Sequence, residues 1–191
     1  MYLATEEDAL QRAGYHATIP VWIPDVNDNR VFSSERFGSM YEPRKGLTGS
    51  LSKMTFQVNR TSKSQCITRY DQGNDLSSKR LRFDAIEDNF FKVADMLHGQ
   101  FKEISVSFQG TYTFSSAAYD PFFLSHIAYL DAYWARWQSL PNSKKTRGVV
   151  KDIRYVLKDA SFKFKSTLFT QQYSKIINKK CIRYKSQEGL F

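Results

Sequence analysis

The sequence is poor in cysteine and has no long apolar run. Cys66 and Cys181 are its two cysteines, too few for the disulfide framework of a small secreted domain, and a bridge between them is allowed but not implied. No stretch reaches the roughly 18 uncharged apolar residues that a transmembrane helix requires. Acidic residues from Glu6 to Asp8 and the basic Arg12 interrupt the start of the chain. This is unlike a signal peptide, so any secretion signal is expected upstream of the sequence.

The familiar catalytic motifs are missing as well. The chain contains no Gly-rich phosphate loop, no Gly-x-Ser-x-Gly elbow and no Cys-x-x-Cys pair. Nothing in it therefore predicts nucleotide binding, a hydrolase nucleophile or a thiol redox centre. One glycosylation sequon begins at Asn59, but such triplets also arise by chance, and the cellular compartment stays open.

Basic residues outnumber acidic ones by 28 to 19, but the excess is confined to the end of the chain. Residues 1–140 hold 15 Lys and Arg against 16 Asp and Glu, whereas residues 141–191 hold 13 against 3. This basic segment predicts either a surface for an acidic partner, with nucleic acid the less favoured choice, or a solvated tail. The candidate partner-binding side chains are Lys144, Lys145, Arg147, Lys179, Lys180, Arg183 and Lys185.

A length of 191 residues with 41% hydrophobic content predicts one domain with a sizeable core. We expect it to occupy residues 1–140, with segment 141–191 packed against it or partly disordered. Tyr2 to Arg12 is rich in helix-forming residues and is followed by Gly14, a common helix stop. Phe83 to Phe101 places apolar side chains at steps of three and four, which only a helix turns into one stripe.

A third helix is predicted to begin at Asp120, whose carboxylate can cap it, with Pro121 at the first helical position. Its apolar stripe consists of Phe123, Ile127, Leu130, Trp134 and Trp137. We assign the aromatic residues of this helix to core packing rather than to a substrate site. Between the helices, Ile104 to Phe114 begins with alternating apolar and polar residues, which favours a short strand or an extended crossover.

Residues Ile19 to Lys79 are interrupted every few positions by Pro, Gly, Asn, Asp or Ser. We expect this long irregular excursion to pack over the core with small strands, or to serve a function. After Gly148, alternating and β-branched stretches favour a partly stranded tail. The sequence thus predicts a mainly α fold with long irregular loops and a basic, partly stranded C-terminal segment.

Residues 120–138 read DPFFLSHIAYLDAYWARWQ. They resemble the second-copper signature of the tyrosinases, catechol oxidases and molluscan hemocyanins, in which Asp-Pro, aromatic residues, a His-His pair and Trp-x-x-Trp-Gln follow in order. Other segments of the chain resemble landmarks of this type-3 copper family in the same order. They are Tyr2 to Leu10, Ile19 to Trp22 (IPVW), Val31 to Gly38 (VFSSERFG), Leu47 to Gly49 (LTG) and Cys66 to Arg69 (CITR).

The resemblance implies a helical bundle in which two copper ions are held by six imidazoles. This chain has three histidines, so half of that ligand set is missing. His98 is a candidate residual ligand, but its helical partner in the family pattern would be Ala94 or Lys102, depending on the register. His126 matches the first residue of the His-His pair and is a weaker candidate. Ile127 stands at the ligand position itself.

Hydrocarbon side chains and a protonated lysine offer copper no lone pair, so we expect an incomplete site and no copper. The favoured hypothesis is a non-catalytic pseudoenzyme with a structural or partner-binding role. In this hypothesis His126 is a satisfied core histidine, His98 is a hydrogen-bonded histidine on a helix facing the former copper pocket, and His16 is exposed in a turn. The alternative is a fragment or divergent form of a copper-dependent phenol oxidase or oxygen carrier, completed by residues outside the sequence. The resemblance suggests an extracellular location only if an upstream signal exists.

Overall fold

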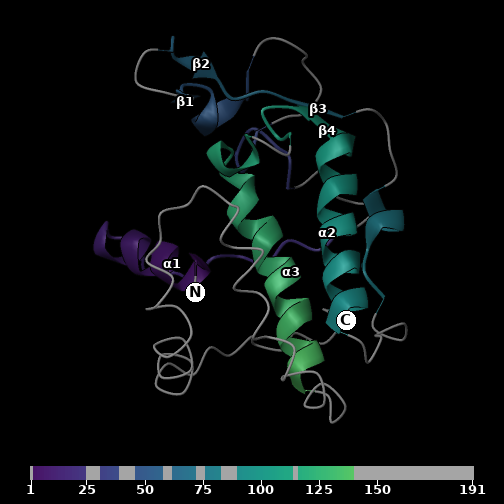
Figure 1. Cartoon of the computed structure of the whole chain (residues 1–191). Coiled ribbons are helices and arrows are strands. Elements are labelled where there is room, and N and C mark those ends of the chain that lie inside the picture. Colours follow the sequence, from purple (N-terminus) through teal and green to yellow (C-terminus); the bar gives the residue numbers. More distant parts are fainter. Residues whose placement is uncertain are drawn as a thin grey trace.

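The computed structural model describes residues 2–24, 31–38, 46–57, 62–71, 76–82, 90–113 and 116–139. These residues form three α-helices, four short strands and three short 3₁₀ helices (Figure 1). The described part of the fold is therefore mainly α, as predicted. The candidate partner-binding side chains of the basic segment 141–191, the second cysteine and the sequon at Asn59 lie outside the described residues.

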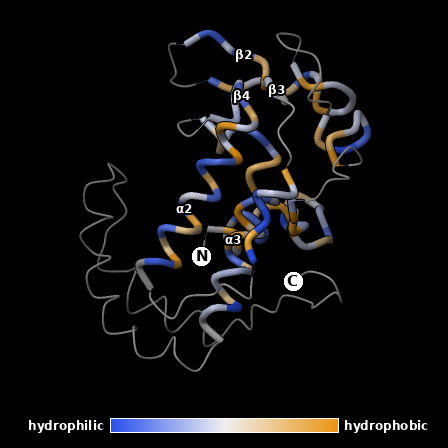
Figure 2. The backbone as a smooth tube through the Cα atoms, turned by 90° about the vertical axis from the view of Figure 1, so that its right-hand side faces the viewer, coloured by the Kyte–Doolittle hydropathy of each residue, from blue (hydrophilic) through white to orange (hydrophobic). Residues whose placement is uncertain are grey.

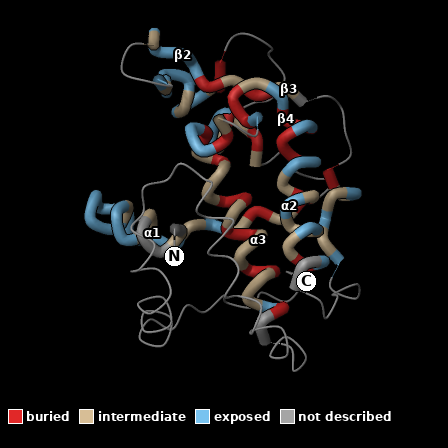
Figure 3. The backbone as a smooth tube through the Cα atoms, viewed as in Figure 1, coloured by how far each residue is buried: buried red, intermediate tan, exposed pale blue. Residues whose placement is uncertain are grey.

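Helix α1 (Tyr2–Arg12) has the bounds that the sequence predicted. It stops at Gly14, which has a φ of 95° and donates its N–H to the Gln11 carbonyl at 3.0 Å. Most of α1 is exposed or half-buried (Figure 3). The chain then leads to Trp22, whose N–H donates to the Ser125 carbonyl 3.1 Å away. This hydrogen bond fixes the segment after α1 against the third helix.

Helices α2 (Phe90–Ser107) and α3 (Phe122–Ser139) lie side by side and antiparallel at the centre of the fold (Figure 1). Their contacts run in opposite sequence directions and join Gln100 to His126, Met96 to Tyr133, and Val93 to Trp137. Apolar and polar contacts therefore define one alignment of α3 on α2.

The end of α2 corrects the predicted strand. The sequence favours an extended segment from Ile104, but the helix continues to Ser107, and only Phe108–Gly110 form a strand, β4. Ile104 and Phe108 follow the preceding apolar stripe at helical steps and are fully buried, whereas Val106 is 59% exposed. The spacing of the buried residues thus favours a helix here, although the local alternation of apolar and polar residues favoured a strand. Residues 83–89 of the predicted helix lie outside the described residues.

Helix α3 begins one residue after the predicted first position, Pro121, and its buried face differs from the predicted stripe. Asp120 Oδ1 accepts a hydrogen bond of 2.9 Å from the Phe122 N–H, which caps the helix. Of the predicted stripe, Trp137 is buried and the other four residues are only half-buried. The enclosed side chains are Phe122, Ser125, His126, Ala128, Tyr129, Ala132 and Tyr133. Several of them have polar tips, which hydropathy does not assign to a core.

The described parts of residues 19–79 pack over the core with small strands, as predicted. Strand β1 (Thr55–Phe56) pairs antiparallel with β2 (Gln65–Cys66), and β3 (Arg69–Asp71) pairs antiparallel with β4. The connections include the 3₁₀ helices η2 (Gly49–Leu51), η3 (Leu76–Lys79) and η5 (Ala117–Tyr119).

Gly110 allows the close pairing of β3 with β4, where it lies opposite Arg69. Its φ is 85°, and a Cβ placed on it would lie 2.5 Å from the Thr68 carbonyl oxygen. The same carbonyl accepts the Thr111 N–H at 2.8 Å. A larger residue at this position would push β4 away from β3.

The loops and the helices share one largely aromatic core. Its buried members are Trp22, Phe32, Leu76, Ile104, Phe108, Tyr112, Ala117 and Phe122. Hydrophobic and hydrophilic residues alternate along α2 in Figure 2, and buried residues recur along α2 and α3 in Figure 3. Among the described residues, none of the helices has the length and apolar character needed to cross a membrane.

Candidate functional site

His126, the histidine that the sequence places in the helix beginning at Asp120, is fully buried at the centre of the core. Its Nδ1 lies 2.6 Å from the Tyr112 hydroxyl oxygen, and its Nε2 lies 2.7 Å from Gln100 Oε1. The three residues come from α3, from the turn after β4 and from α2. Both ring nitrogens are therefore engaged by other parts of the same chain.

The direction of these hydrogen bonds follows from the chemistry of the groups. The Gln100 amide oxygen can only accept, so Nε2 of His126 carries the proton and Nδ1 accepts from the Tyr112 hydroxyl. The Gln100 amide nitrogen donates in turn to the Lys79 carbonyl at 3.4 Å. We call this series, from Tyr112 through His126 and Gln100 to Lys79, the His126 chain.

Burial keeps the His126 chain neutral. Loss of hydration lowers the pKa of His126 from 6.5 to about 3. Burial also raises the pKa of the Tyr112 hydroxyl well above 10; the nearby Asp120 charge adds to this rise and the Arg69 charge opposes it. A neutral imidazole and a neutral phenol are the forms that the hydrogen bonds require, so burial and hydrogen bonding favour the same state.

Aromatic rings enclose the imidazole of His126. The Trp22 ring meets it edge-on, at 90° and 5.5 Å between centroids. Phe101 of α2 stacks on it at 5.4 Å and Phe122 of α3 at 6.0 Å. This enclosure explains the strong desolvation of the ring, and the two hydrogen bonds satisfy the polar atoms that it buries.

A buried ion pair lies at the start of α3. Arg69 Nε is 2.5 Å from Asp120 Oδ2, Nη2 is 3.1 Å from Oδ1, and both side chains are fully buried. Nη2 also donates to the Phe37 carbonyl at 2.6 Å. The guanidinium lies 5.5 Å and 5.8 Å from the ring centroids of Phe32 and Phe122. The pair joins β3 and the Phe37 loop to the residue that caps α3, so it stabilises the fold.

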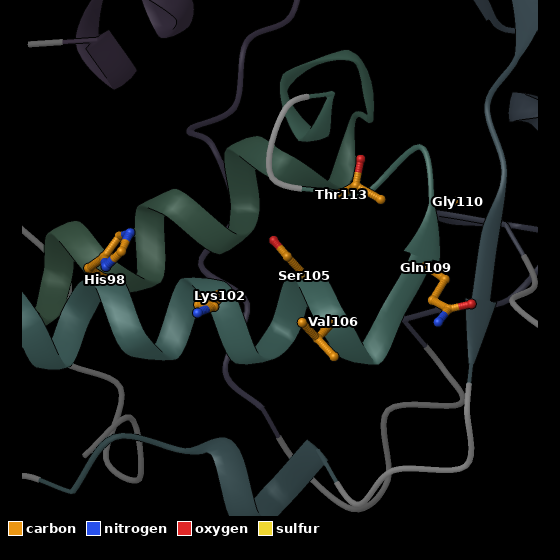
Figure 4. A pocket seen from close by; sticks show the side chains of 7 residues that line it. All are labelled: His98, Lys102, Ser105, Val106, Gln109, Gly110 and Thr113. Carbon is orange, nitrogen blue, oxygen red and sulfur yellow. The ribbon is translucent and has the colours of Figure 1, made fainter. Parts of the chain in front are cut away.

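The remaining metal candidates do not meet His126. His98 and Lys102 are exposed on α2, whereas Ala94 and Ile127 are half-buried. His98 and Lys102 share one face of α2, where they line an open depression (Figure 4). His98 is two positions from the α2 residue that binds His126, and such a step turns a helical side chain to nearly the opposite side. The structure therefore separates the two histidines that the sequence suggested as ligands.

A metal ion at His126 does not fit this arrangement. Coordination of either ring nitrogen would break a hydrogen bond and leave a polar atom of Tyr112 or Gln100 unpaired in the core. In the part of the chain that the structure describes, no three His, Cys, Asp or Glu side chains are grouped so that they could hold a metal ion. The imidazole instead connects α2, α3 and the turn after β4.

The prediction that His126 is a satisfied core histidine is confirmed, and His16 is exposed as predicted. Both partners of His126 were missed. A signal for Gln100 was present, because it lies on the same helical line as the apolar Val93 and Ile104. A polar residue on the buried side of a helix predicts a buried hydrogen-bond partner.

Comparison with known proteins assigns no family. No family model and no curated protein matches the sequence. The function is therefore argued from the residues and contacts described above.

Proposed function

We propose that this protein is a tyrosinase-family-like pseudoenzyme that lacks a complete type-3 copper site and has a structural or partner-binding role. The observation that carries the proposal is the engagement of both His126 ring nitrogens by Tyr112 and Gln100. In a copper site that binds oxygen, histidine nitrogens converge on the metal. Here the imidazole is a hydrogen-bonded part of the core.

The residues at the other family ligand positions favour the same proposal. Ile127 and Ala94 present only hydrocarbon, which offers copper no lone pair. Lys102 is exposed on α2, and its ammonium group repels a cation. Each of these three positions thus lacks a lone pair for copper or carries a positive charge.

The packing of the resembling segments supports the family part of the proposal. Three of them are far apart in the sequence but meet around the first turns of α3. Trp22 lies against His126, Arg69 pairs with Asp120, and Phe37 supplies a carbonyl to Arg69. These contacts involve aromatic rings, a carboxylate and a guanidinium, so they hold the scaffold without a metal ion.

Copper loading tests the proposal. The purified full chain would be incubated with copper under reducing and then aerobic conditions, freed of excess metal, and analysed for bound copper and for absorbance of an oxygen-to-copper charge-transfer band. We expect neither stoichiometric copper nor the band. The variants His98→Ala and His16→Ala are the matched pair, because both histidines are exposed but only His98 is a ligand candidate.

Stoichiometric copper that His98→Ala removes and His16→Ala retains would contradict the proposal. It would favour the alternative, a divergent copper-dependent phenol oxidase or oxygen carrier completed by residues outside the sequence. Copper that both variants retain would point to ligands other than these two histidines and would equally count against a copper-free role.

The partner-binding role rests on the basic segment 141–191, with 13 basic and 3 acidic residues. We expect an immobilised acidic polypeptide to bind the full chain, and the binding to weaken steeply with salt, because the attraction is between charges. Removal of residues 141–191 should abolish it. Binding that salt leaves unchanged, or that survives the truncation, would contradict this role for the segment.

A further inference from the structure

An open depression lies on the face of α2 that points away from the His126 chain. It has a volume of about 680 Å³, within the range of roughly 300–1,000 Å³ that is typical of small-molecule sites. Figure 4 shows His98, Lys102, Ser105 and Val106 along α2, and Gln109 and Thr113 beyond its end. Gly110 completes the lining.

Ser105 gives this depression an unsatisfied donor. Its side chain is 5% exposed, and its Oγ has no hydrogen-bond partner among the described residues. Ser107, two positions later on the same helix, is 3% exposed, but its Oγ donates to the Glu103 carbonyl at 3.0 Å. A buried hydroxyl without a partner is costly and is usually satisfied by water or a ligand. Ser105 is one of the residues that line the depression, so it forms part of the wall against which a molecule would bind.

The charges around Ser105 select the sign of such a molecule. Lys102 lies one turn before Ser105 on the same face, and none of the lining residues is acidic. Glu103, the next acidic residue on α2, is 3.5 Å from Lys79 and does not line the depression. Asp95 lies one turn before His98 on α2, and its negative charge is close to the His98 side of the depression. The positive charge of the depression is therefore at its Lys102 side. An acceptor-only group with negative charge suits an ammonium and a hydroxyl donor.

Val106 adds an apolar contact, since this residue of the lining is 59% exposed. We propose that the depression binds a small organic carboxylate, with its carboxylate between Lys102 and Ser105 and its apolar body on Val106. The proposal uses only the lining of this face and does not depend on the copper family or on the role of His126.

The probe is cyclohexanecarboxylate, which has a carboxylate and a compact apolar body. Amide chemical shifts of the full chain would be followed during titration. We expect saturable shifts confined to residues 98–113, with a dissociation constant on the order of 1 mM, as for a ligand of this size with few polar contacts. Cyclohexanecarboxamide, which lacks the charge, and acetate, which lacks the body, should each bind at least about tenfold more weakly.

Variants separate the two polar contacts. Lys102→Gln should weaken the carboxylate about tenfold, whereas Lys53→Gln, the same charge change at an exposed lysine outside the depression, should not. Ser105→Ala should weaken binding and Ser107→Ala should not, since only the Ser105 hydroxyl is unpaired. The amide spectrum of each variant without ligand reports whether that variant remains folded, because a folded chain keeps its dispersed chemical shifts.

Three results would overturn the proposal. The first is the absence of saturable shifts in residues 98–113. The second is equal binding of the carboxamide, which would show that charge has no part. The third is unchanged binding by Ser105→Ala, which would show that water satisfies the hydroxyl. None of these results depends on copper loading, so the two proposals fail or survive separately.

Discussion

Arg69 and Asp120 lie 51 residues apart in the sequence and form a bidentate ion pair with both side chains fully buried. Asp120→Asn keeps an oxygen for the Phe122 N–H but leaves the guanidinium without a counter-charge. We expect it to lower the free energy of unfolding by about 3–5 kcal/mol, measured by urea denaturation. Glu103→Gln, at the partly exposed pair with Lys79, should change it by only about 0–1 kcal/mol. Similar losses in both variants would contradict the structural role of the buried pair.

Tyr112→Phe tests the His126 chain. It removes the hydroxyl and leaves Nδ1 of His126 buried without a partner, so the free energy of unfolding should fall by about 1–3 kcal/mol. The control is Tyr119→Phe, because the Tyr119 side chain is 40% exposed. Its effect should stay within about 0.5 kcal/mol. If Tyr112→Phe were as stable as the wild type in thermal or urea denaturation, Nδ1 of His126 would have another hydrogen-bond donor.

The low pKa of His126 predicts how stability depends on pH. Between about pH 6.5 and about pH 3 the unfolded chain binds a proton that the folded imidazole does not. The free energy of unfolding therefore falls as pH is lowered through this window, by up to about 1.4 kcal/mol per pH unit. His126→Gln cannot titrate, so it should lose this part of the dependence. The carboxylates are common to both proteins and cancel in the difference.

Urea denaturation of the two proteins across that pH window provides the measurement. The gap between the curves should narrow steadily on acidification, because only the wild type loses the stability linked to His126 protonation. Curves that stay parallel would show that the imidazole is protonated in the folded state or reaches solvent.

Two glycines, one inside α2 and one in β4, should respond in opposite directions to substitution by alanine. Gly110→Ala forces a Cβ to within 2.5 Å of the Thr68 carbonyl oxygen at a φ of 85°, and it should destabilise the fold by at least about 1–2 kcal/mol. Gly99 lies inside α2 with nothing within 4 Å of an added Cβ. Gly99→Ala should stabilise by about 0.5–1 kcal/mol, because it favours the helix. Destabilisation by both would contradict the helical setting of Gly99.

Local signals in the sequence were sufficient for much of the helical fold. The Gly14 stop and the Asp120 cap are short-range features, and they mark the end of α1 and the start of α3 correctly. The 3.6-residue spacing around Val93 to Phe101 identified α2. These signals depend on neighbouring residues alone, so tertiary contacts did not override them.

The errors arose where tertiary packing decides. The alternation from Ile104 to Gln109 fits a strand, but Ile104 and Phe108 also continue the helical stripe, and the core against α3 favours the helix. Likewise, the buried face of α3 contains Tyr129 and Tyr133, whose hydroxyls meet the Leu81 N–H and the Arg82 carbonyl. Those partners come from a distant loop, so hydropathy along α3 could not identify them.

The candidate site was predictable in kind but not in detail. The sequence indicated a buried, satisfied histidine at position 126, and that is confirmed. It did not identify Tyr112, which contacts His126 from the turn that follows Gly110 of β4. Nor did it identify the unpaired hydroxyl of Ser105, because the predicted strand would have placed that side chain among other residues than the helix does.

The His126 chain also restricts how the two long helices can slide. Moving α3 along α2 by one helical turn, about 5.4 Å, would still bring hydrocarbon against hydrocarbon. It would, however, move the imidazole away from both Gln100 and Tyr112 and leave three polar groups in the core without hydrogen-bond partners. The hydrogen bonds of His126 thus specify one register of α3 on α2 and disfavour the shifted registers that apolar contacts alone would allow.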